Sequence, residues 1–303
     1  MSRIIEVKGF EKSYGEVKAV KGISFYVEEG KLFSFLGPNG AGKSTTIDTL
    51  CTLLKMDKGN ITVAGYDLEK EAHAIRQEIG VVFQESLLDD KLTVKENLMI
   101  RAGLYLKGRK AIKKAVEEVS DLISLEEFAH RPYGKLSGGQ RRRTDIGAAL
   151  LHRPKILFLD EPTTGLDPQT RLMIWDTIKN LQAKSGMTLF LTTHYMEEAA
   201  DSDYIIIIDH GKIAARGTPF EMKSRYASDT LRIRTSDVEK LLKRLVFTEL
   251  EAREMGGELV IKIENVKDAL GIIEELKDCV EGFEVRQGSI DDVFIGITGR
   301  EIR

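Results

Sequence analysis

The sequence predicts an α/β protein with a mostly parallel sheet, followed by a small α+β domain. Up to about residue 217, short apolar runs alternate with segments of helical periodicity, which is typical of a parallel sheet. The runs are almost continuously apolar, as in strands that helices cover on both faces. After Gly217-Thr218-Pro219 the pattern changes. A chain of 303 residues allows one large domain or two unequal ones, and we expect two, at 1–218 and 219–303.

The first domain is expected to contain two kinds of sheet. Ile4–Val7 and Ile23–Val27, separated by a turn-rich segment with Gly15, indicate a small antiparallel sheet at the N-terminus. Five apolar runs predict the parallel strands: Leu32–Leu36, Ile79–Phe83, Ile156–Leu159, Thr188–Leu191 and Tyr204–Ile208. Helical periodicity predicts the helices between them: Lys43–Leu54, Val94–Leu106, Ala111–Ile123, Gly138–Leu151 and Pro168–Ala183.

The second domain has the β-α-β-β-α-β order of a ferredoxin-like fold. Gly256-Gly257 predicts a hairpin, Asn265 is a plausible helix N-cap, and Ser289-Ile290-Asp291-Asp292 resembles the cap of a final short helix. The predicted elements are strand Thr230–Arg234, helix Ser236–Leu245, strands Phe247–Glu254 and Glu258–Ile263, helix Asn265–Leu276 and strand Phe283–Arg286.

Composition excludes several classes of protein. Lys and Arg total 45 against 48 Asp and Glu, a formal charge of −3, which argues against binding nucleic acid mainly through bulk positive charge. Cys51 and Cys279 form no CxxC or Cys/His cluster, so neither a disulfide framework nor a zinc site is indicated. The N-terminus lacks the apolar region of a signal peptide, and no apolar run approaches the ~20 residues of a membrane span. We therefore expect any membrane role to require a partner.

A glycine-rich segment predicts a phosphate site. Gly37-Pro38-Asn39-Gly40-Ala41-Gly42-Lys43-Ser44 fits G-x-x-x-x-G-K-[ST], follows a predicted strand and opens a predicted helix. Glycines let backbone N–H groups converge on phosphate oxygens, and the helix N-terminus adds its positive dipole end. Lys43 is expected to reach the β- and γ-phosphates, and the Ser44 hydroxyl to ligate Mg²⁺.

A second strand ends in two carboxylates. Ile156–Leu159 is followed by Asp160 and Glu161, and ligands of open α/β folds bind at the carboxyl ends of strands. We expect Asp160 to hold Mg²⁺, directly or through water. Glu161 is placed to polarise a water molecule against the γ-phosphate.

The segment Leu136-Ser137-Gly138-Gly139-Gln140 decides between kinds of phosphate-binding protein. LSGGQ is the signature of the ATP-binding cassette (ABC) ATPases, which the chain resembles over about residues 3–218. The resemblance implies a P-loop NTPase cassette with an antiparallel N-terminal sheet and a helical subdomain at about 85–152. It also implies ATP hydrolysis with Mg²⁺. Small residues at a helix N-terminus suit an anion, and in the family this surface binds the γ-phosphate of ATP that a second copy holds.

The resemblance assigns individual roles. Gln84 matches the Q-loop glutamine, which contacts Mg²⁺ or water, and His194 matches the switch histidine, which touches the γ-phosphate. Asp167 matches the D-loop aspartate, although Thr164-Gly165 stands where the family commonly has Ser-Ala, a mild variation. The implied catalytic residues are Glu161, His194 and Gln84, and the implied metal ligands are Ser44, Gln84 and Asp160. The implied ATP-binding residues are Tyr14 (stacking on adenine), Gly37, Pro38, Asn39, Gly40, Ala41, Gly42, Lys43, Ser44, Thr45, Ser137, Gly138, Gly139, Gln140 and Asp167.

Further stretches resemble the daunorubicin-resistance-type branch of the family. They are 62–67, 82–85, 88–93 and the ending 289–303. The branch implies a subunit that powers export of a drug, lipid, polysaccharide or antibiotic through a separate ABC-2-type membrane protein. Its partners would be a second copy, in an ATP-dependent head-to-tail dimer, and that permease, at the cytoplasmic face of the membrane. The permease's short helix would dock on the segment from Gln84 through Glu96.

Three interpretations stay open from the sequence. One alternative is a soluble ABC ATPase that acts on nucleic acid or ribosomes, although such proteins usually carry two cassettes or a long coiled-coil insertion, and we expect no direct nucleic-acid binding. Residues 220–303 are interpreted as an accessory domain that senses a ligand, mediates dimerisation or is inert. Arg141-Arg142-Arg143, behind the signature, is interpreted as a solvated or interfacial helix face rather than a phosphate or nucleic-acid patch.

Overall fold

The computed structural model of the chain describes residues 2–235, 239, 241, 251–263 and 265–299. It divides into two compact units, Met1–Arg216 and Gly217–Arg303. Each unit is described separately below.

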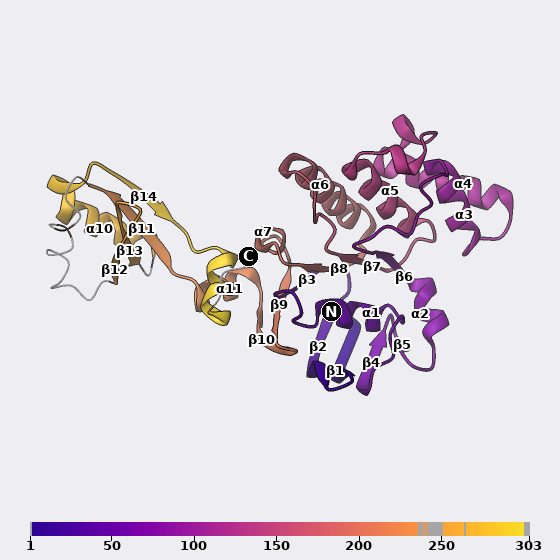
Figure 1. Cartoon of the computed structure of the whole chain (residues 1–303), viewed down its shortest axis with the longest axis horizontal. Helices are drawn as coiled ribbons and strands as arrows, with labels where there is room; N and C mark the ends of the chain where they lie inside the picture. The colour runs from indigo at the N-terminus through magenta and orange to yellow at the C-terminus, as the bar shows by residue number, and fades with distance from the viewer. Residues whose placement is uncertain (1, 236–238, 240, 242–250, 264, 300–303) are drawn as a thin grey trace. The chain divides into compact units, whose positions relative to one another are not determined.

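The N-terminal part of the first unit is an antiparallel sheet (Figure 1). Its strands are in the order β2-β1-β4-β5, with β1 at Arg3–Tyr14, β2 at Val17–Glu28, β4 at Lys58–Val63 and β5 at Tyr66–Asp67. The prediction of an antiparallel sheet is confirmed, but β1 and β2 are much longer than the predicted apolar runs. Backbone pairing between β1 and β2 extends to Tyr14 and Val17, beyond the apolar residues that gave the sequence signal.

The second sheet has six strands and carries the functional residues at its carboxyl edge. The order is β10-β9-β3-β8-β7-β6, and the pairs β9–β3, β3–β8, β8–β7 and β7–β6 are parallel. Because β3, β8 and β7 are neighbours, the loops that follow them meet at one place. The strands are β3 Leu32–Leu36, β6 Ile79–Val82, β7 Ile156–Asp160, β8 Thr188–Thr193, β9 Tyr204–Asp209 and β10 Lys212–Gly217.

Both faces of this sheet are covered, which explains its continuously apolar strands. Leu157, Leu159 and Leu189 belong to a core cluster with the helices, and alternate residues such as Phe158 and Phe190 belong to a second cluster shared with the antiparallel sheet. Side chains alternate between the faces of a strand, so every position is buried when both faces are packed. Figure 1 shows α3, α4, α5 and α6 on one side of the sheet and β1, β2 and β4 on the other.

The predicted helices are present, with differences at their ends. The first helix ends at Leu50 rather than Leu54, because Cys51 caps it and Thr52 takes a left-handed conformation with φ 63°. A short helix at Ala72–Glu78 was not predicted, since only Ile75 on it is buried. The helices are α1 Lys43–Leu50, α2 Ala72–Glu78, α3 Val94–Gly103, α4 Arg109–Ile123, α5 Gly138–Leu150, α6 Pro168–Ser185 and α7 Met196–Ala199.

The second unit contains a four-stranded antiparallel sheet in the order β12-β13-β11-β14. This order is that of a ferredoxin-like fold, as predicted. Asn265 caps α10 as expected, by accepting a hydrogen bond from the Lys267 N–H at 3.0 Å. The elements are β11 Asp229–Arg234, β12 Ala252–Met255, β13 Glu258–Ile263, α10 Val266–Leu276 and β14 Gly282–Arg286. The predicted helix Ser236–Leu245 and the start of the strand Phe247–Glu254 lie largely outside the described residues.

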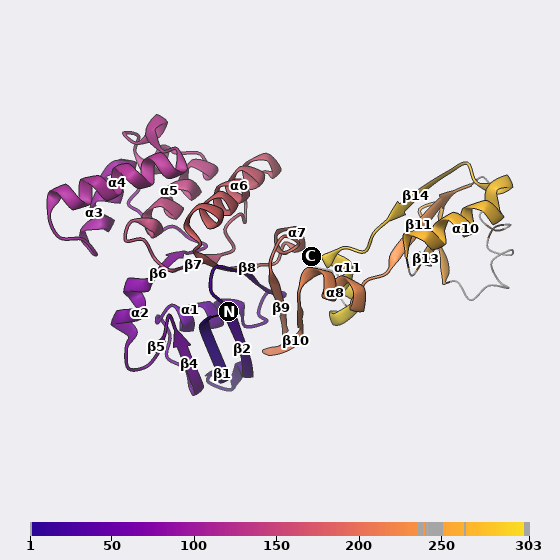
Figure 2. The same ribbon diagram turned by 180° about the vertical axis from the view of Figure 1, so that it is seen from behind.

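Two further helices of this unit lie together, apart from its sheet (Figure 2). They are α8, Pro219–Tyr226, and α11, Ile290–Thr298. The predicted cap of the last helix is confirmed, because Ser289 and Asp292 form a reciprocal capping box. In the part of the chain that the structure describes, no helix is long and apolar enough to cross a bilayer.

Candidate active site

The loop after β3 is shaped by glycines at positions where a side chain would collide with the backbone of a neighbour. A Cβ on Gly37 would lie 2.4 Å from the Ile208 carbonyl oxygen, and one on Gly42 would lie 2.7 Å from that of Ala19. Gly42 also has φ 109°, a conformation that side chains disfavour, and caps α1. The loop is therefore held tightly against β9 and β2, with its N–H groups leading into a helix N-terminus.

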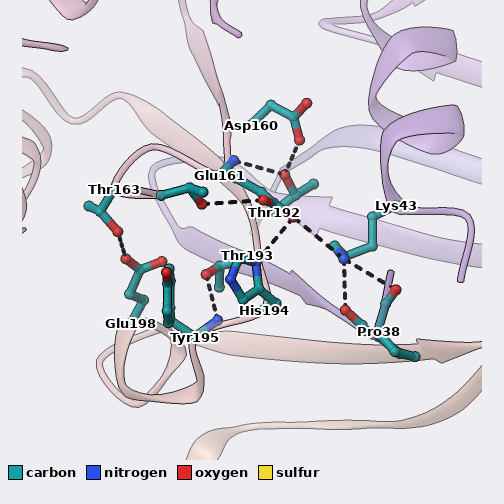
Figure 3. A network of polar contacts seen from close by, with 12 residues as sticks. Pro38, Lys43, Asp160, Glu161, Thr163, Thr192, Thr193, His194, Tyr195 and Glu198 are labelled. Atoms are coloured by element: carbon teal, nitrogen blue, oxygen red, sulfur yellow. Dashed lines mark hydrogen bonds and ion pairs between the residues drawn. The ribbon is translucent and has the colours of Figure 1, made fainter. Parts of the chain in front are cut away.

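Lys43 extends from the first turn of α1 back across this loop (Figure 3). Its Nζ donates hydrogen bonds to the carbonyls of Gly37 at 2.7 Å and Pro38 at 3.3 Å, and lies 3.6 Å from Glu161 Oε1. Burial lowers the pKa of Lys43, while the Glu161 carboxylate opposes that shift. A poorly solvated cation inside a concave loop favours phosphate oxygens as ligands.

Asp160 and Glu161 are consecutive residues at the end of β7, and their carboxylates have different hydrogen-bond partners. Asp160 is 8% exposed and accepts a hydrogen bond from the Thr192 hydroxyl of β8, and burial raises the pKa of its carboxyl group. Glu161 leaves the strand with φ 43°, a left-handed conformation that is unusual for a side-chain-bearing residue. Its N–H donates to the Thr192 carbonyl at 3.0 Å, and its Oε2 accepts from the Thr164 hydroxyl at 3.2 Å.

His194 follows β8 and completes a group of three charged or polar side chains. Its Nδ1 lies 3.3 Å from Glu161 Oε1, the oxygen that also lies near Lys43 (Figure 3). The contact is close but not aligned as a hydrogen bond. The ring packs on Tyr195, with a centroid distance of 4.1 Å, and the Tyr195 N–H donates to the Thr193 hydroxyl. Three strands thus bring a lysine, a carboxylate and an imidazole together.

Lys43, Glu161 and His194 line one open cleft of about 670 Å³. The structure brings nine of the predicted site residues to it: Asn39, Gly40, Gly42, Lys43, Ser44, Thr45, Gln84, Glu161 and His194. Gly37, Pro38 and Ala41 form the loop behind it, and Asp160 lies beside Glu161. Ala19 and Thr164 also line the cleft and were not among the predicted site residues. From the sequence, Thr164 stands out only as a variation of the D-loop. Its hydroxyl contact with Glu161 gives no sequence signal.

The signature lies apart from this cleft, at the N-terminus of α5. Ser137 caps that helix, and its hydroxyl accepts from the Gln140 N–H at 3.4 Å. A Cβ on Gly138 would lie 2.9 Å from the Leu166 side chain, and one on Gly139 would lie 2.5 Å from that of Thr170. A larger residue at either position would have to displace one of these side chains, so the two glycines allow α5 to pack closely on Leu166 and on the first turn of α6. Among the described residues that line the cleft, none belongs to the signature.

Asp167 and Tyr14 have their own local supports. Asp167 caps α6 by accepting from the Thr170 N–H at 3.0 Å, and hydrogen bonds from Thr170 lower the pKa of its carboxyl group. Tyr14 ends β1 with half of its surface exposed. Asp57 holds that end of β1, because its carboxylate accepts from the Ser13 N–H at 2.7 Å and from Lys12 Nζ at 2.9 Å.

The interpretation of the three arginines after the signature is wrong for one of them. Arg142 is only 7% exposed and bonds to backbone carbonyls of the loop after β7 and to that of Phe83. Arg141 and Arg143 are partly exposed, as the interpretation required. Three adjacent arginines do not reveal which one faces inward, because α5 contacts other elements on more than one side.

Comparisons with known proteins match both units of the chain. The ABC transporter family matches residues 20–164, and the family of ATP-binding protein DrrA1-3-like C-terminal domains matches residues 217–298. The daunorubicin resistance ATP-binding protein DrrA3 of Streptomyces coeruleorubidus is 34% identical, over 99% of this chain and 97% of its own. The chain belongs to the ABC transporter ATP-binding proteins. The resemblance noted from the motifs is confirmed.

Two other relatives of this ABC ATP-binding protein have similar coverage. The linearmycin resistance ATP-binding protein LnrL of Bacillus subtilis is 37% identical over 99% of this chain and 100% of its own. The Nod factor export ATP-binding protein I of Ralstonia nicotianae is 37% identical over 99% of this chain and 95% of its own. The chain is thus an ABC ATPase of the DrrA-like group along its whole length.

Solved structures support the fold and the activity. A dimeric ATP-binding cassette in a post-hydrolysis state, bound to ADP and Pi, is 30% identical and covers 71% of this chain and 98% of its own, with a TM-score of 0.65. The cassette cbiO1 of Clostridium perfringens is part of an ABC transporter complex. It is 25% identical, with a TM-score of 0.69, and the match covers 82% of this chain and 96% of its own. This ABC ATPase binds ATP and hydrolyses it.

Proposed function

We propose that the chain is the nucleotide-binding subunit of an exporter and works as a head-to-tail pair of copies that share two composite ATP sites. The observation that carries this proposal is the separation of the cleft from the signature. Lys43, Glu161 and His194 line the cleft, whereas the N-terminus of α5 with Ser137 does not. A site that needs both surfaces is completed by the signature of a second copy.

Within one site, the residues have distinct tasks. The loop N–H groups and Lys43 bind the β- and γ-phosphates, and Glu161 orients the attacking water and accepts its proton. His194 keeps the Glu161 carboxylate and the γ-phosphate in register, since its Nδ1 lies 3.3 Å from Glu161 Oε1. Tyr14 offers a ring face to the adenine, and Asp167 positions the start of α6 at the interface with the second copy.

The donor set near the cleft fits Mg²⁺. A Ser44 hydroxyl, a Gln84 amide oxygen and the Asp160 carboxylate are the oxygen ligands that this ion favours, and Ser44 and Gln84 line the cleft. When bound, Mg²⁺ neutralises charge on the β- and γ-phosphate oxygens. Asp160 is prepared for this task, because the Thr192 hydroxyl fixes the orientation of its carboxylate.

A separate membrane subunit is the proposed partner, at the cytoplasmic face of the membrane. A groove of about 560 Å³ is lined by residues after Gln84 and by α3 and α5, among them Leu87, Arg101 and Tyr105. Leu87 is 64% exposed, and Leu53 at the same groove is 60% exposed, so two large apolar side chains are accessible at one site. The names of the relatives indicate resistance to daunorubicin or linearmycin, or export of Nod factor, which supports export as the direction of transport.

Substitution of Glu161 tests the proposal. We expect Glu161→Gln to bind ATP with nearly unchanged affinity, hydrolyse it at least 100-fold more slowly (the order of a lost general base), and form a stable ATP-dependent dimer. Hydrolysis would be followed by phosphate release, binding by calorimetry, and dimerisation by light scattering.

Two further variants control this experiment. Glu197→Gln makes the same change on an exposed side chain of α7 and is expected to hydrolyse ATP like the wild type. Lys43→Ala is expected to weaken ATP binding itself. Hydrolysis by Glu161→Gln at the wild-type rate would contradict the role proposed for this carboxylate.

A further inference from the structure

Arg142 is a buried arginine whose contacts connect three parts of the ATP site. It lies one turn inside α5, after the signature, and is 7% exposed. Burial lowers the pKa of its guanidinium group, and Asp145 opposes that shift from 4.0 Å. An arginine is seldom buried unless its donors are satisfied, so its partners show what it does.

Its partners are backbone carbonyls of two separate segments. Nε donates to the Pro162 carbonyl, and Nη2 donates to the carbonyls of Glu161 at 2.8 Å and Asp160 at 3.4 Å. Nη1 donates to the carbonyl of Phe83 at 2.5 Å. Phe83 immediately precedes Gln84, and the other three residues form the turn that leaves β7.

The contact with Glu161 bears on a strained residue. Glu161 has φ 43°, a strained conformation that persists only when its surroundings hold it. Its N–H is bonded to the Thr192 carbonyl, and its own carbonyl is bonded to Arg142. The two peptide groups that flank the Glu161 side chain are therefore each held by a hydrogen bond, one to β8 and one to α5, and its carboxylate lies near Lys43 and His194.

A second contact from the same helix holds the other side of Gln84. Asp145, one turn after Arg142, accepts hydrogen bonds from the Ser86 hydroxyl at 2.6 Å and the Tyr133 hydroxyl at 3.0 Å. The residues before and after Gln84 are thus both tied to α5. A shift of α5 would move the Gln84 segment and the Glu161 turn together.

We propose that Arg142 is a positioning residue for Glu161, which couples the orientation of that carboxylate to the signature helix and to the Gln84 segment. This inference rests on the proposed catalytic role of Glu161. It explains why the arginine is buried and why its hydrogen bonds go to backbone carbonyls, while the Asp145 carboxylate lies 4.0 Å from its Nη1. Hydrogen bonds from Arg142 to these carbonyls fix the path of the backbone. They do not use the Glu161 carboxylate, which stays free to act on water.

Arg142→Lys tests this proposal, because an ammonium group keeps the charge but lacks the planar set of donors that reaches four carbonyls. We expect kcat to fall roughly 10- to 100-fold, the range for a small misplacement of a catalytic group. KM for ATP should change less than about twofold, since Arg142 touches none of the described residues that line the cleft except Glu161. Rates would be expressed per ATP-binding site, so that partly unfolded protein does not count as slow enzyme.

Arg143→Lys is the matched control. Arg143 is the next residue of α5, and its guanidinium contacts only the Phe128 ring and the Ser124 carbonyl in the described contacts. We expect its kcat to equal that of the wild type. If Arg142→Lys folds poorly, Arg142→Gln keeps two N–H donors and is measured in the same way.

A double substitution separates positioning from a general structural role. If Arg142 acts through the Glu161 carboxylate, Arg142→Lys should slow the residual single-turnover rate of Glu161→Gln by less than about twofold. An equal slowing in both backgrounds, or a wild-type kcat for Arg142→Lys, would overturn the inference. Full activity of Glu161→Gln would instead overturn the proposed function itself, so the two failures are distinguishable.

Discussion

At the scale of single residues, the ATP site depends on atoms that hold the functional side chains as much as on those side chains. The hydroxyls of Thr192 and Thr164 bond to the carboxylates of Asp160 and Glu161, respectively. The Asp57 carboxylate accepts hydrogen bonds from Lys12 and Ser13 at the end of β1, next to Tyr14. The Thr192 and Asp57 contacts join segments that are distant in the sequence, whereas Thr164 lies only three residues from Glu161.

Substitution of Asp57 tests whether such a supporting contact matters for binding adenine near Tyr14. We expect Asp57→Ala to weaken ATP binding roughly threefold to tenfold, because the segment before Tyr14 loses its hydrogen bonds to the carboxylate. Binding of inorganic triphosphate, which has no adenine, should not change. Calorimetry with the two ligands measures both affinities.

The control for Asp57 is another aspartate that bonds backbone N–H groups. Asp67 accepts from the N–H groups of Glu69 and Lys70 in the turn after β5, remote in sequence from Tyr14. Asp67→Ala is expected to bind ATP like the wild type. Equal losses of ATP and triphosphate affinity in Asp57→Ala would show that the whole cleft is disturbed rather than the adenine end.

At the scale of elements, α5 joins the signature to the groove proposed for the membrane subunit. Its N-terminus carries Ser137, its first turns hold the Glu161 and Gln84 segments, and Asp145 and Ala149 line the groove. A helix is a stiff element, so movement at one end is carried to the other. Under the proposed function, docking of a membrane subunit in the groove and closure of a second copy on the signature would therefore act on the same element.

The groove can be tested by charging one exposed leucine. We expect Leu87→Glu to reduce co-purification with the membrane subunit at least roughly tenfold, as for an apolar contact at the centre of an interface. Leu270→Glu, on a 69% exposed leucine of α10, is the control and should co-purify normally. Normal assembly of the Leu87→Glu protein would place the partner elsewhere.

At the scale of the whole molecule, the two units each have a hydrophobic core. The clusters that contain Phe158 and Leu157 lie in the first unit, and a third cluster around Leu231 and Ile261 lies in the second. Every residue that lines the ATP cleft, from Ala19 to His194, belongs to the first unit. The first unit by itself therefore forms the cleft among the described residues.

A truncation tests what the second unit does. A chain of residues 1–218, which keeps all of β10, should fold and bind ATP within about twofold of the full-length affinity, because the cleft is complete. ATP-dependent dimerisation and basal ATPase activity would be compared in the same preparations. A folded truncation that fails to bind ATP would contradict the assignment of the cleft to one unit.

The sequence by itself determined the elements whose signal is local. The alternation of apolar runs and helices predicted the parallel sheet, and glycine spacing predicted the loop around Lys43 because a phosphate-binding turn requires glycine there. The chain order of the second unit predicted its ferredoxin-like sheet. Asn265 and Ser289 were found as caps, since a cap depends only on residues two to four positions away.

Only the tertiary structure decided the features that depend on contacts between distant segments. The strand order β3-β8-β7 places Lys43, His194 and Glu161 within reach of one another. The burial of Arg142 depends on which side of α5 faces the sheet, and its neighbours in sequence have the same side chain. Supporting residues such as Thr192 and Asp57 produce no periodic pattern in the sequence. A hydrogen bond between distant segments constrains only one residue in each segment.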